Sequence, residues 1–256
     1  MLGTLVGFLA GLLGIGGGLL IVPALVFLLD YLLHIPIEHA MPIAIASSLS
    51  TVIFTGLSSA RTHWRLGNLS RSIMLFCGIG IAVGASAGAH FASAIAGVTL
   101  QRIFAICVML IALQMAFMGR RRSQHSVAPW GMLAIGLFTG FMSALMGIGG
   151  GALLVPLLVW FQVDIRRAIG CAAFCGIIVA LFGTANFIYT GWQQTYLPAW
   201  SLGYVFLPAT LGIALTSVLI APIGARFGQN VDTGLLKKIF AGFLAVVSLR
   251  MIIGLE

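Results

Sequence analysis

The sequence carries little charge. Only 7% of its 256 residues are Asp, Glu, Lys or Arg, whereas a soluble domain is usually about a quarter charged. Hydrophobic residues make up 61% of the chain, and no stretch is polar enough to form a separate soluble domain. This shortage of charge excludes an ordinary soluble enzyme and predicts an all-α polytopic integral membrane protein.

Acidic residues and cysteines are also scarce. The five acidic residues all lie at the ends of apolar runs or in loops: Asp30, Glu38, Asp164, Asp232 and Glu256. Carriers that move protons usually keep a carboxylate inside the membrane, so this absence argues against a carboxylate proton relay and favours an anionic substrate. The four cysteines lack the His or carboxylate spacing of a metal site, and we interpret them as packing residues. We therefore expect neither a metal nor a cofactor.

Hydropathy divides the chain into eight apolar segments. They run over residues 2–30, 40–60, 71–92, 98–118, 130–161, 168–190, 201–224 and 235–254. No basic stretch precedes the first segment, so we expect no cleavable signal peptide. The net charge of +8 comes from basic residues in short loops, where they set membrane topology, and we expect no nucleic-acid partner.

The two halves of the sequence repeat each other. GFLAGLLGIGGGLLIVP at 7–23 matches GFMSALMGIGGGALLVP at 140–156 in 11 of 17 positions. Two shorter pairs follow at one common offset: GAHF (88–91) with GARF (224–227), and RIFA (102–105) with KIFA (238–241). Such duplication is common in transporters. It predicts three parts: a first transmembrane repeat over 1–119, a cytoplasmic basic linker over 120–129, and a second transmembrane repeat over 130–256.

The motif GIGGG occurs in both halves, at 14–18 and at 147–151. Four glycines in five residues disfavour a helix, because each costs about 1 kcal/mol relative to Ala. A helix break in lipid survives only where protein or a water-filled cavity covers it. We therefore predict that each repeat opens with a glycine-broken helix, either a re-entrant hairpin or a discontinuous spanning helix. The alternative is a glycine surface for close helix packing.

Loop charges favour the hairpin model. If all eight segments cross the membrane, the basic residues divide 7 to 6 and indicate no orientation. If the first and fifth segments are hairpins, one side has 11 basic residues: Arg61, Arg65, Arg71, Arg120, Arg121, Arg122, Arg166, Arg167, Arg226, Lys237 and Lys238. The other side then has only Arg102 and Arg250. This positive-inside pattern predicts inverted repeats in a bacterial cytoplasmic (inner) membrane, with Arg120–Arg122 in the cytoplasm and both termini external.

The half-helices that follow the glycines suggest a binding site. A helix N-terminus offers free N–H donors and a partial positive charge, and two of them converging near the membrane midplane would hold an anion without a basic side chain. The candidate substrate-binding residues are Gly14, Gly16, Gly17, Gly18, Gly147, Gly149, Gly150, Gly151, Ser47, Ser48, Thr51 and Asn186.

Hydroxyl side chains follow one face of the segment at 40–60. Ser47, Thr51, Thr55 and Ser58 recur at helical spacing. They either donate to an oxyanion or bond within their own helix and to its neighbours, and the same alternatives apply to Asn186. At the end of this segment, Arg61, His63 and Arg65 either gather anions in a cytoplasmic vestibule or only anchor the topology.

Several motifs together resemble the TauE/SafE family. They are the two GIGGG…VP segments, SSL at 47–49, HWRLGN at 63–68, and the pair RIFA and KIFA. The family is associated with export of sulfite and of organosulfonates such as sulfoacetate, so the resemblance implies a small sulfur oxyanion as substrate. Its hydroxyl motif falls on Ser47 and Ser48 but departs to Cys171 and Ala172 in the second half, which implies a lopsided site.

These observations favour a secondary transporter that exports a small sulfur-containing oxyanion by alternating access around the two glycine motifs. Another anion, import, or a channel remain alternatives within transport. An intramembrane enzyme is disfavoured because no His accompanies the membrane serines, and we expect no catalytic residues. A structural or assembly protein is the third class. The expected partners are the anion and membrane lipids, and a homodimer stays open.

Overall fold

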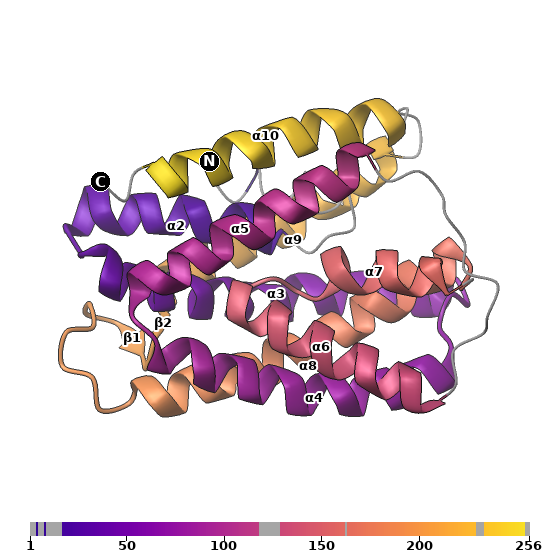
Figure 1. Cartoon of the computed structure of the whole chain (residues 1–256), viewed down its shortest axis with the longest axis horizontal. Coiled ribbons are helices and arrows are strands. Elements are labelled where there is room, and N and C mark those ends of the chain that lie inside the picture. Colours follow the sequence, from indigo (N-terminus) through magenta and orange to yellow (C-terminus); the bar gives the residue numbers. More distant parts are fainter. Residues whose placement is uncertain are drawn as a thin grey trace.

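The structure, a computed structural model, describes Thr4, Phe8 and residues 17–117, 129–161, 163–228 and 233–253. This part of the chain is helical apart from one small β-hairpin (Figure 1). Its helices are α2 (Gly18–Leu33), α3 (Ile37–Arg65), α4 (Arg71–Ala94), α5 (Gly97–Phe117), α6 (Pro129–Met146), α7 (Gly151–Trp160), α8 (Ile165–Gly191), α9 (Leu207–Gly228) and α10 (Thr233–Ile253). The predicted all-α class is confirmed.

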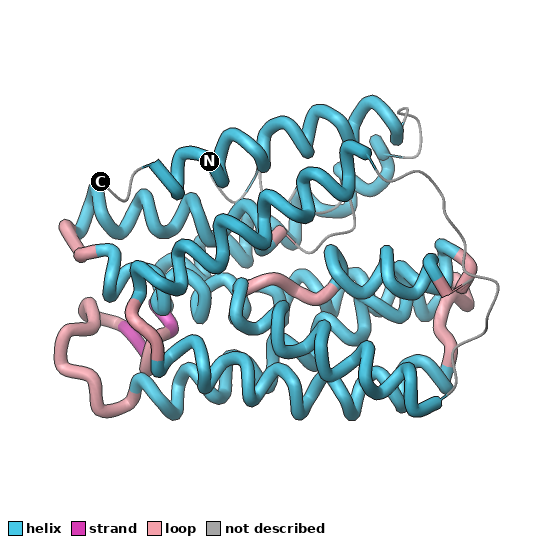
Figure 2. The backbone as a smooth tube through the Cα atoms, in the orientation of Figure 1, coloured by secondary structure: helices cyan, strands magenta, loops and turns pink. Residues whose placement is uncertain are grey.

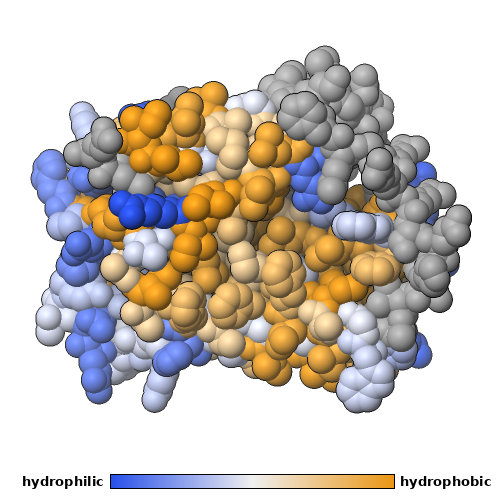
Figure 3. Space-filling model, viewed as in Figure 1, coloured by the Kyte–Doolittle hydropathy of each residue, from blue (hydrophilic) through white to orange (hydrophobic). Residues whose placement is uncertain are grey.

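Within the described residues, five helices are long and apolar enough to cross a membrane: α3, α4, α5, α6 and α8. The described apolar parts of α2, α7, α9 and α10 are shorter. Large apolar side chains on the outer faces are exposed, for example Leu75 at 59% and Leu219 at 73%. Figure 3 shows such residues as a belt across the middle of the molecule, with hydrophilic residues at both ends. This is the surface of a protein whose middle lies in lipid.

The long helices meet at two ends of the molecule. At the basic end, α3 finishes at Arg65, α4 begins at Arg71 and α8 begins at Ile165. At the β-hairpin end, α2 turns into α3, and Gly97 at the start of α5 packs against the backbone of Glu38. Figure 1 shows the β-hairpin at the left, with the basic end at the right.

The second predicted hairpin, 130–161, is divided into α6 and α7. Cys77 of α4 donates its S–H to Met132 O, which places the start of α6 beside the start of α4 at the basic end. Helix α7 also finishes at the basic end, because only a short loop separates Trp160 from α8. Figure 2 shows the loop between α6 and α7 crossing the middle of the molecule. The chain therefore leaves the basic end along α6 and returns to it along α7.

Close glycine packing occurs between α4 and α6. A Cβ added at Gly84 would collide with Leu137 O, and one added at Gly140 would lie 2.6 Å from Ile81 O. The two backbones therefore lie in direct contact, which is the role of small residues between membrane helices.

The predicted segment at 201–224 is partly wrong. Residues 201–206 form an antiparallel hairpin, in which Ser201 pairs with Phe206 and Leu202 with Val205, and α9 begins only at Leu207. Gly203, with a φ of 55°, turns the chain in a conformation that side-chain-bearing residues rarely adopt. The apolar composition of this stretch is that of a membrane segment, but the turn residue interrupts the helix.

An aromatic cluster holds the β-hairpin in place. The hydroxyls of Tyr196 and Tyr204 are hydrogen-bonded at 3.0 Å, and the Tyr196 ring stacks on His39 with 3.7 Å between centroids. Burial raises the pKa of the Tyr204 phenol well above its usual value, and the bond with Tyr196 acts in the same direction. The hairpin therefore packs as a fixed part of this end of the molecule.

Candidate functional site

The second GIGGG motif forms a complete break between α6 and α7. Gly147 and Gly150 have φ values of 69° and 73°, in the left-handed region that favours glycine. Between them the helical hydrogen bonds are replaced by tight turns, in which Gly150 N–H donates to Ile148 O and Gly151 N–H to Gly149 O, both at 2.8 Å. The glycines therefore end one helix and start another inside the protein.

The first motif is described from Gly17 onward, so Gly14 and Gly16 lie outside the described residues. Gly17 has a φ of 74° and precedes α2. Its carbonyl accepts from the N–H groups of Leu20 and Ile21, at 3.0 and 3.1 Å. The two motifs thus begin α2 and α7 with the same left-handed glycine, since Gly150 holds that position before α7.

The two glycine motifs touch each other. A Cβ added at Gly18 would lie 2.5 Å from Gly147 O and 2.9 Å from the Cα of Ile148, so backbone meets backbone. From this contact α2 runs to the β-hairpin end and α7 to the basic end. The structure therefore brings Gly18 and Gly147 together and starts two oppositely directed half-helices beside them.

Free backbone donors lie at this contact. The N–H groups of Gly18 and Leu19 in α2, and of Ala152 in α7, take part in no hydrogen bond of the described residues. All three residues are buried. Because buried backbone groups are nearly always paired, free donors at two adjacent helix N-termini are unusual and suit a negatively charged group.

The glycines also serve close packing. A Cβ added at Gly147 would lie 2.9 Å from the Val22 side chain and 3.0 Å from the Cα of Ile45, and one at Gly149 would lie 2.6 Å from Val52. Gly150 has more room, with Val179 at 3.5 Å. In this conformation the second break is therefore enclosed by α2, α3 and α8.

The candidate hydroxyls Ser47, Ser48 and Thr51 of α3 are all hydrogen-bonded, and one of them bonds the second break directly. Ser48 donates to Gly147 O at 2.7 Å, across 99 residues of sequence. Thr51 donates to Ser48 O within its own helix, at 2.7 Å. Ser47 accepts from Phe206 N–H at 2.9 Å. Ser48 thus fixes the break to α3, Thr51 bonds its own backbone, and the Ser47 hydrogen has no acceptor among the described residues.

The remaining predicted residues lie elsewhere. Asn186 is half-buried, and its side-chain oxygen has no partner in the described structure. Arg61 and Arg65 are exposed and His63 is half-buried, all near the basic end of α3. Arg61 is about 20 Å further along the helix axis than Ser48, at a rise of about 1.5 Å per residue. These three residues therefore do not join the glycine contact.

Two buried hydroxyls were not identified from the sequence. Thr139 and Ser143 of α6 have no exposed surface, and neither oxygen has a hydrogen-bond partner within the described residues. They lie one helical turn apart, just before the second GIGGG motif, in the stretch FTGFMSALMGIGGG. That spacing is the signal that would have found them.

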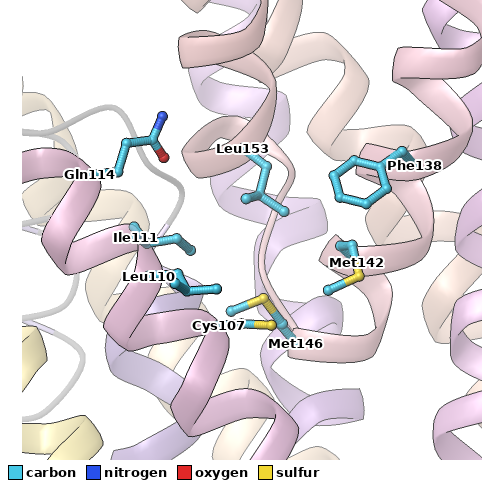
Figure 4. A pocket seen from close by; sticks show the side chains of 8 residues that line it. All are labelled: Cys107, Leu110, Ile111, Gln114, Phe138, Met142, Met146 and Leu153. Carbon is cyan, nitrogen blue, oxygen red and sulfur yellow. The ribbon is translucent and has the colours of Figure 1, made fainter. Parts of the chain in front are cut away.

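An apolar cavity of about 150 Å³ lies beside the same break. Figure 4 shows Cys107, Leu110, Ile111 and Gln114 of α5 on one side, with Phe138, Met142 and Met146 of α6 and Leu153 of α7 on the other. Met146 and Leu153 flank the glycine segment. The lining is apolar except for Gln114, so the cavity offers no charge to an ion.

The described cysteines agree with a packing role. Cys77, Cys171 and Cys175 are buried, and Cys171 Sγ accepts from Ser70 N–H at 3.3 Å. Within the described ranges, no group of His, Cys, Asp and Glu side chains is arranged to hold a metal ion.

Comparison with known proteins decides the family. The model of the family "Sulfite exporter TauE/SafE" matches residues 1–251. The chain belongs to the TauE/SafE family. The resemblance inferred from the glycine motifs is therefore confirmed over nearly the whole sequence.

Other TauE/SafE-like chains carry transporter names. A "probable membrane transporter protein" of Haemophilus influenzae is 37% identical, over 98% of this chain and 96% of its own. One of Methanocaldococcus jannaschii is 26% identical, over 99% and 94%. One of Bacillus subtilis is 27% identical, over 91% of each chain. No solved structure matches this TauE/SafE chain. The family and its relatives identify a membrane transporter.

Proposed function

We propose that this transporter exports a small sulfur-containing oxyanion, such as sulfite or an organosulfonate, by alternating access around the two glycine breaks. The observation that carries the proposal is the contact of Gly18 with Gly147, beside N–H groups at the starts of α2 and α7 that have no acceptor among the described residues. Each helix N-terminus contributes roughly half a positive charge, and burial strengthens its attraction for an anion. The sulfur assignment rests on the family description.

Charge around the contact also favours an anion. The nearby side chains of α3 are hydroxyls and aliphatic groups, and the described acidic residues Asp30, Glu38 and Asp164 lie at or near helix ends. A cation at the contact would face the positive ends of two helices without a carboxylate to balance them. An anion there would meet backbone N–H groups that are free among the described residues, and none of the described carboxylates.

The helix directions support an inverted repeat. Helices α2 and α7 open the two halves and run to opposite ends from their contact. A pair of equivalent hydrogen bonds supports the same relation. Ser70 N–H, before α4, donates to Cys171 of α8, and Phe206 N–H, before α9, donates to Ser47 of α3. Cys171 thus provides in one half the acceptor that Ser47 provides in the other.

Basic residues support the orientation. Arg61, Arg65, Arg71, Arg166 and Arg167 all lie at the basic end and are exposed. Arg102 and Arg250 lie toward the β-hairpin end. The positive-inside rule then places the basic end in the cytoplasm. Arg120–Arg122, predicted to be cytoplasmic, lie outside the described residues. An inside-negative potential drives each negative charge outward by about 2.3 kcal/mol per 100 mV.

The test is exchange in proteoliposomes. Purified protein is reconstituted, and flux of radiolabelled sulfite is measured against internal sulfite, sulfoacetate, sulfate, thiosulfate or acetate. We expect saturable flux that is accelerated by a sulfur oxyanion on the opposite side. Flux that does not saturate and shows no acceleration indicates a channel. Acceleration by acetate alone contradicts the sulfur assignment, and no flux with any anion contradicts the proposal.

A further inference from the structure

Thr139 and Ser143 hold two hydroxyl groups that the described structure leaves unpaired. Both side chains have no exposed surface, and neither oxygen has a hydrogen-bond partner. Buried polar side chains almost always have a partner, so two unpaired hydroxyls one helical turn apart need an explanation. Several other hydroxyls of the described helices, such as Ser86 and Thr190, bond to a carbonyl of their own helix. Thr139 and Ser143 therefore remain available as donors.

The face of α6 that carries these hydroxyls is directed inward. Gly136 touches the α4 backbone, and Phe138 and Met142 line the cavity beside α5. At about 100° per residue, positions 139 and 143 lie between these two faces and away from the exposed Trp130. The end of α6 is capped by the loop that follows it, because Ile148 N–H donates to Ser143 O at 2.9 Å. Both hydroxyls thus lie on the buried side of α6, within its last two turns before the glycine break.

The helix that follows the break supplies a further hydrogen-bond donor. Helix α7 has ten residues, begins at Gly151 after the left-handed Gly150, and its Ala152 N–H is free among the described residues. We propose that Thr139 and Ser143, together with the first turn of α7, form an oxyanion seat in which the hydroxyls determine substrate specificity. This inference rests on the proposed function, because it assigns Thr139 and Ser143 to the binding of the transported anion.

The chemistry of the seat selects a particular class of anion. Two hydroxyls and a backbone N–H direct several hydrogen bonds, which match an anion that has at least two oxygen acceptors, as a sulfite or sulfonate group does. A halide is a single acceptor atom, so donors that point in separate directions bind it less strongly than they bind an oxyanion. The seat is therefore expected to favour sulfur oxyanions over chloride, in addition to attracting negative charge.

The experiment removes the hydroxyls while keeping the side-chain shape. Thr139→Val and Ser143→Ala are compared with Thr139→Ser, which restores a hydroxyl. Ser86→Ala and Thr216→Val are matched controls, because each of these hydroxyls bonds a carbonyl of its own helix. Half-saturation for radiolabelled sulfite, inhibition by chloride, and melting temperature in detergent are measured for every protein.

We expect Thr139→Val and Ser143→Ala each to raise the sulfite concentration that gives half-maximal flux by roughly tenfold. Each substitution removes a hydrogen bond to a charged group. Chloride should compete better in these variants, and Thr139→Ser and both controls should behave as the unmodified protein does. The melting temperature should not fall, since an unpaired buried hydroxyl is removed.

Three results would overturn the seat. In the first, the unmodified protein exchanges sulfite and both variants reach half-maximal flux at the same sulfite concentration as it does. That result refutes the seat and leaves the proposed function intact. A loss of affinity that tracks a lower melting temperature, and that Thr139→Ser does not restore, indicates a purely structural role. Unmodified protein that exchanges no anion removes the proposed function and the seat together.

Discussion

Gly18 and Gly150 have different reasons to be glycine. At Gly18 the constraint is space, because a Cβ would lie 2.5 Å from the carbonyl oxygen of Gly147. At Gly150 the constraint is conformation, because φ is 73° while the nearest atom to an added Cβ is 3.5 Å away. A backbone carbonyl in a packed interior moves less readily than a side chain, so the first constraint is the stricter one.

Alanine at these positions tests the difference. We expect Gly18→Ala to lower the free energy of unfolding by more than about 2 kcal/mol and to abolish exchange, because it separates the two breaks. Gly150→Ala should lower the free energy of unfolding by about 1–2 kcal/mol, because the alanine would have to adopt a left-handed conformation. Melting in detergent and sulfite exchange measure both effects.

Gly212 provides the matched control. It lies in α9, and an added Cβ would meet no atom within 4 Å. Gly212→Ala should leave exchange unchanged and melting unchanged or slightly higher, because Ala is favoured over Gly in a helix. If Gly18→Ala behaves as Gly212→Ala does, the contact between the breaks is not essential.

At the scale of elements, α4 and α6 form the tightest pair in the described fold. Their contact depends on glycines on both sides, with Gly84 against Leu137 and Gly140 against Ile81. Because α4 belongs to the first half of the sequence and α6 to the second, this contact joins the two halves. These glycines lie outside the two GIGGG motifs, so the packing surface that the sequence offered as an alternative role for GIGGG is here formed by other glycines.

Valine at Gly84 tests this pairing. We expect Gly84→Val to push α4 and α6 apart and to lower the melting temperature strongly, because its branches would meet backbone atoms of Leu137 and Phe141. Val83→Leu, one residue earlier and 57% exposed, is the control and should melt as the unmodified protein does. A Gly84→Val protein with unchanged melting would contradict the assigned contact.

The sequence predicts most elements because each depends on local composition. The apolar runs at 71–92 and 98–118 correspond to α4 and α5 within two residues at each end, and the dense glycines of the second motif do end a helix. The hairpin at 201–206 was missed because its residues are as apolar as a helix and only Gly203 marks the turn.

The site depends on partners that are distant in sequence. Ser48 and Gly147 are hydrogen-bonded across 99 residues, so composition alone does not reveal how the serine is used. Thr139 and Ser143 look like any pair of helix hydroxyls until the surrounding helices are known. Periodicity finds the face of a helix on which a residue lies, but not which donors stay unpaired on it.

At the scale of the whole molecule, two loops distinguish the membrane topologies. Leu66 follows α3 and is exposed at the basic end, and Gln193 follows α8 and is exposed at the β-hairpin end. If α6 and α7 form a re-entrant hairpin, three crossings separate the two loops and they face opposite sides. If the fifth segment crosses the membrane fully, four crossings separate them and they face the same side.

Cysteine labelling in intact cells shows which side of the membrane each loop faces. We expect a membrane-impermeant maleimide to label Gln193→Cys and not Leu66→Cys, because the basic end is proposed to be cytoplasmic. Permeabilised cells should label both, which controls for exposure. Equal labelling of both variants in intact cells would contradict the hairpin model and the inverted repeat.

The backbone contact between Gly18 and Gly147 also constrains how such a protein can move. No side chain separates the two main chains at this junction, and in the proposed alternating access we expect the two halves to tilt about it. Such a tilt would open one side of the molecule while it narrows the other. A single pivot of this kind would keep the two sides from opening together, as the proposed transport cycle requires.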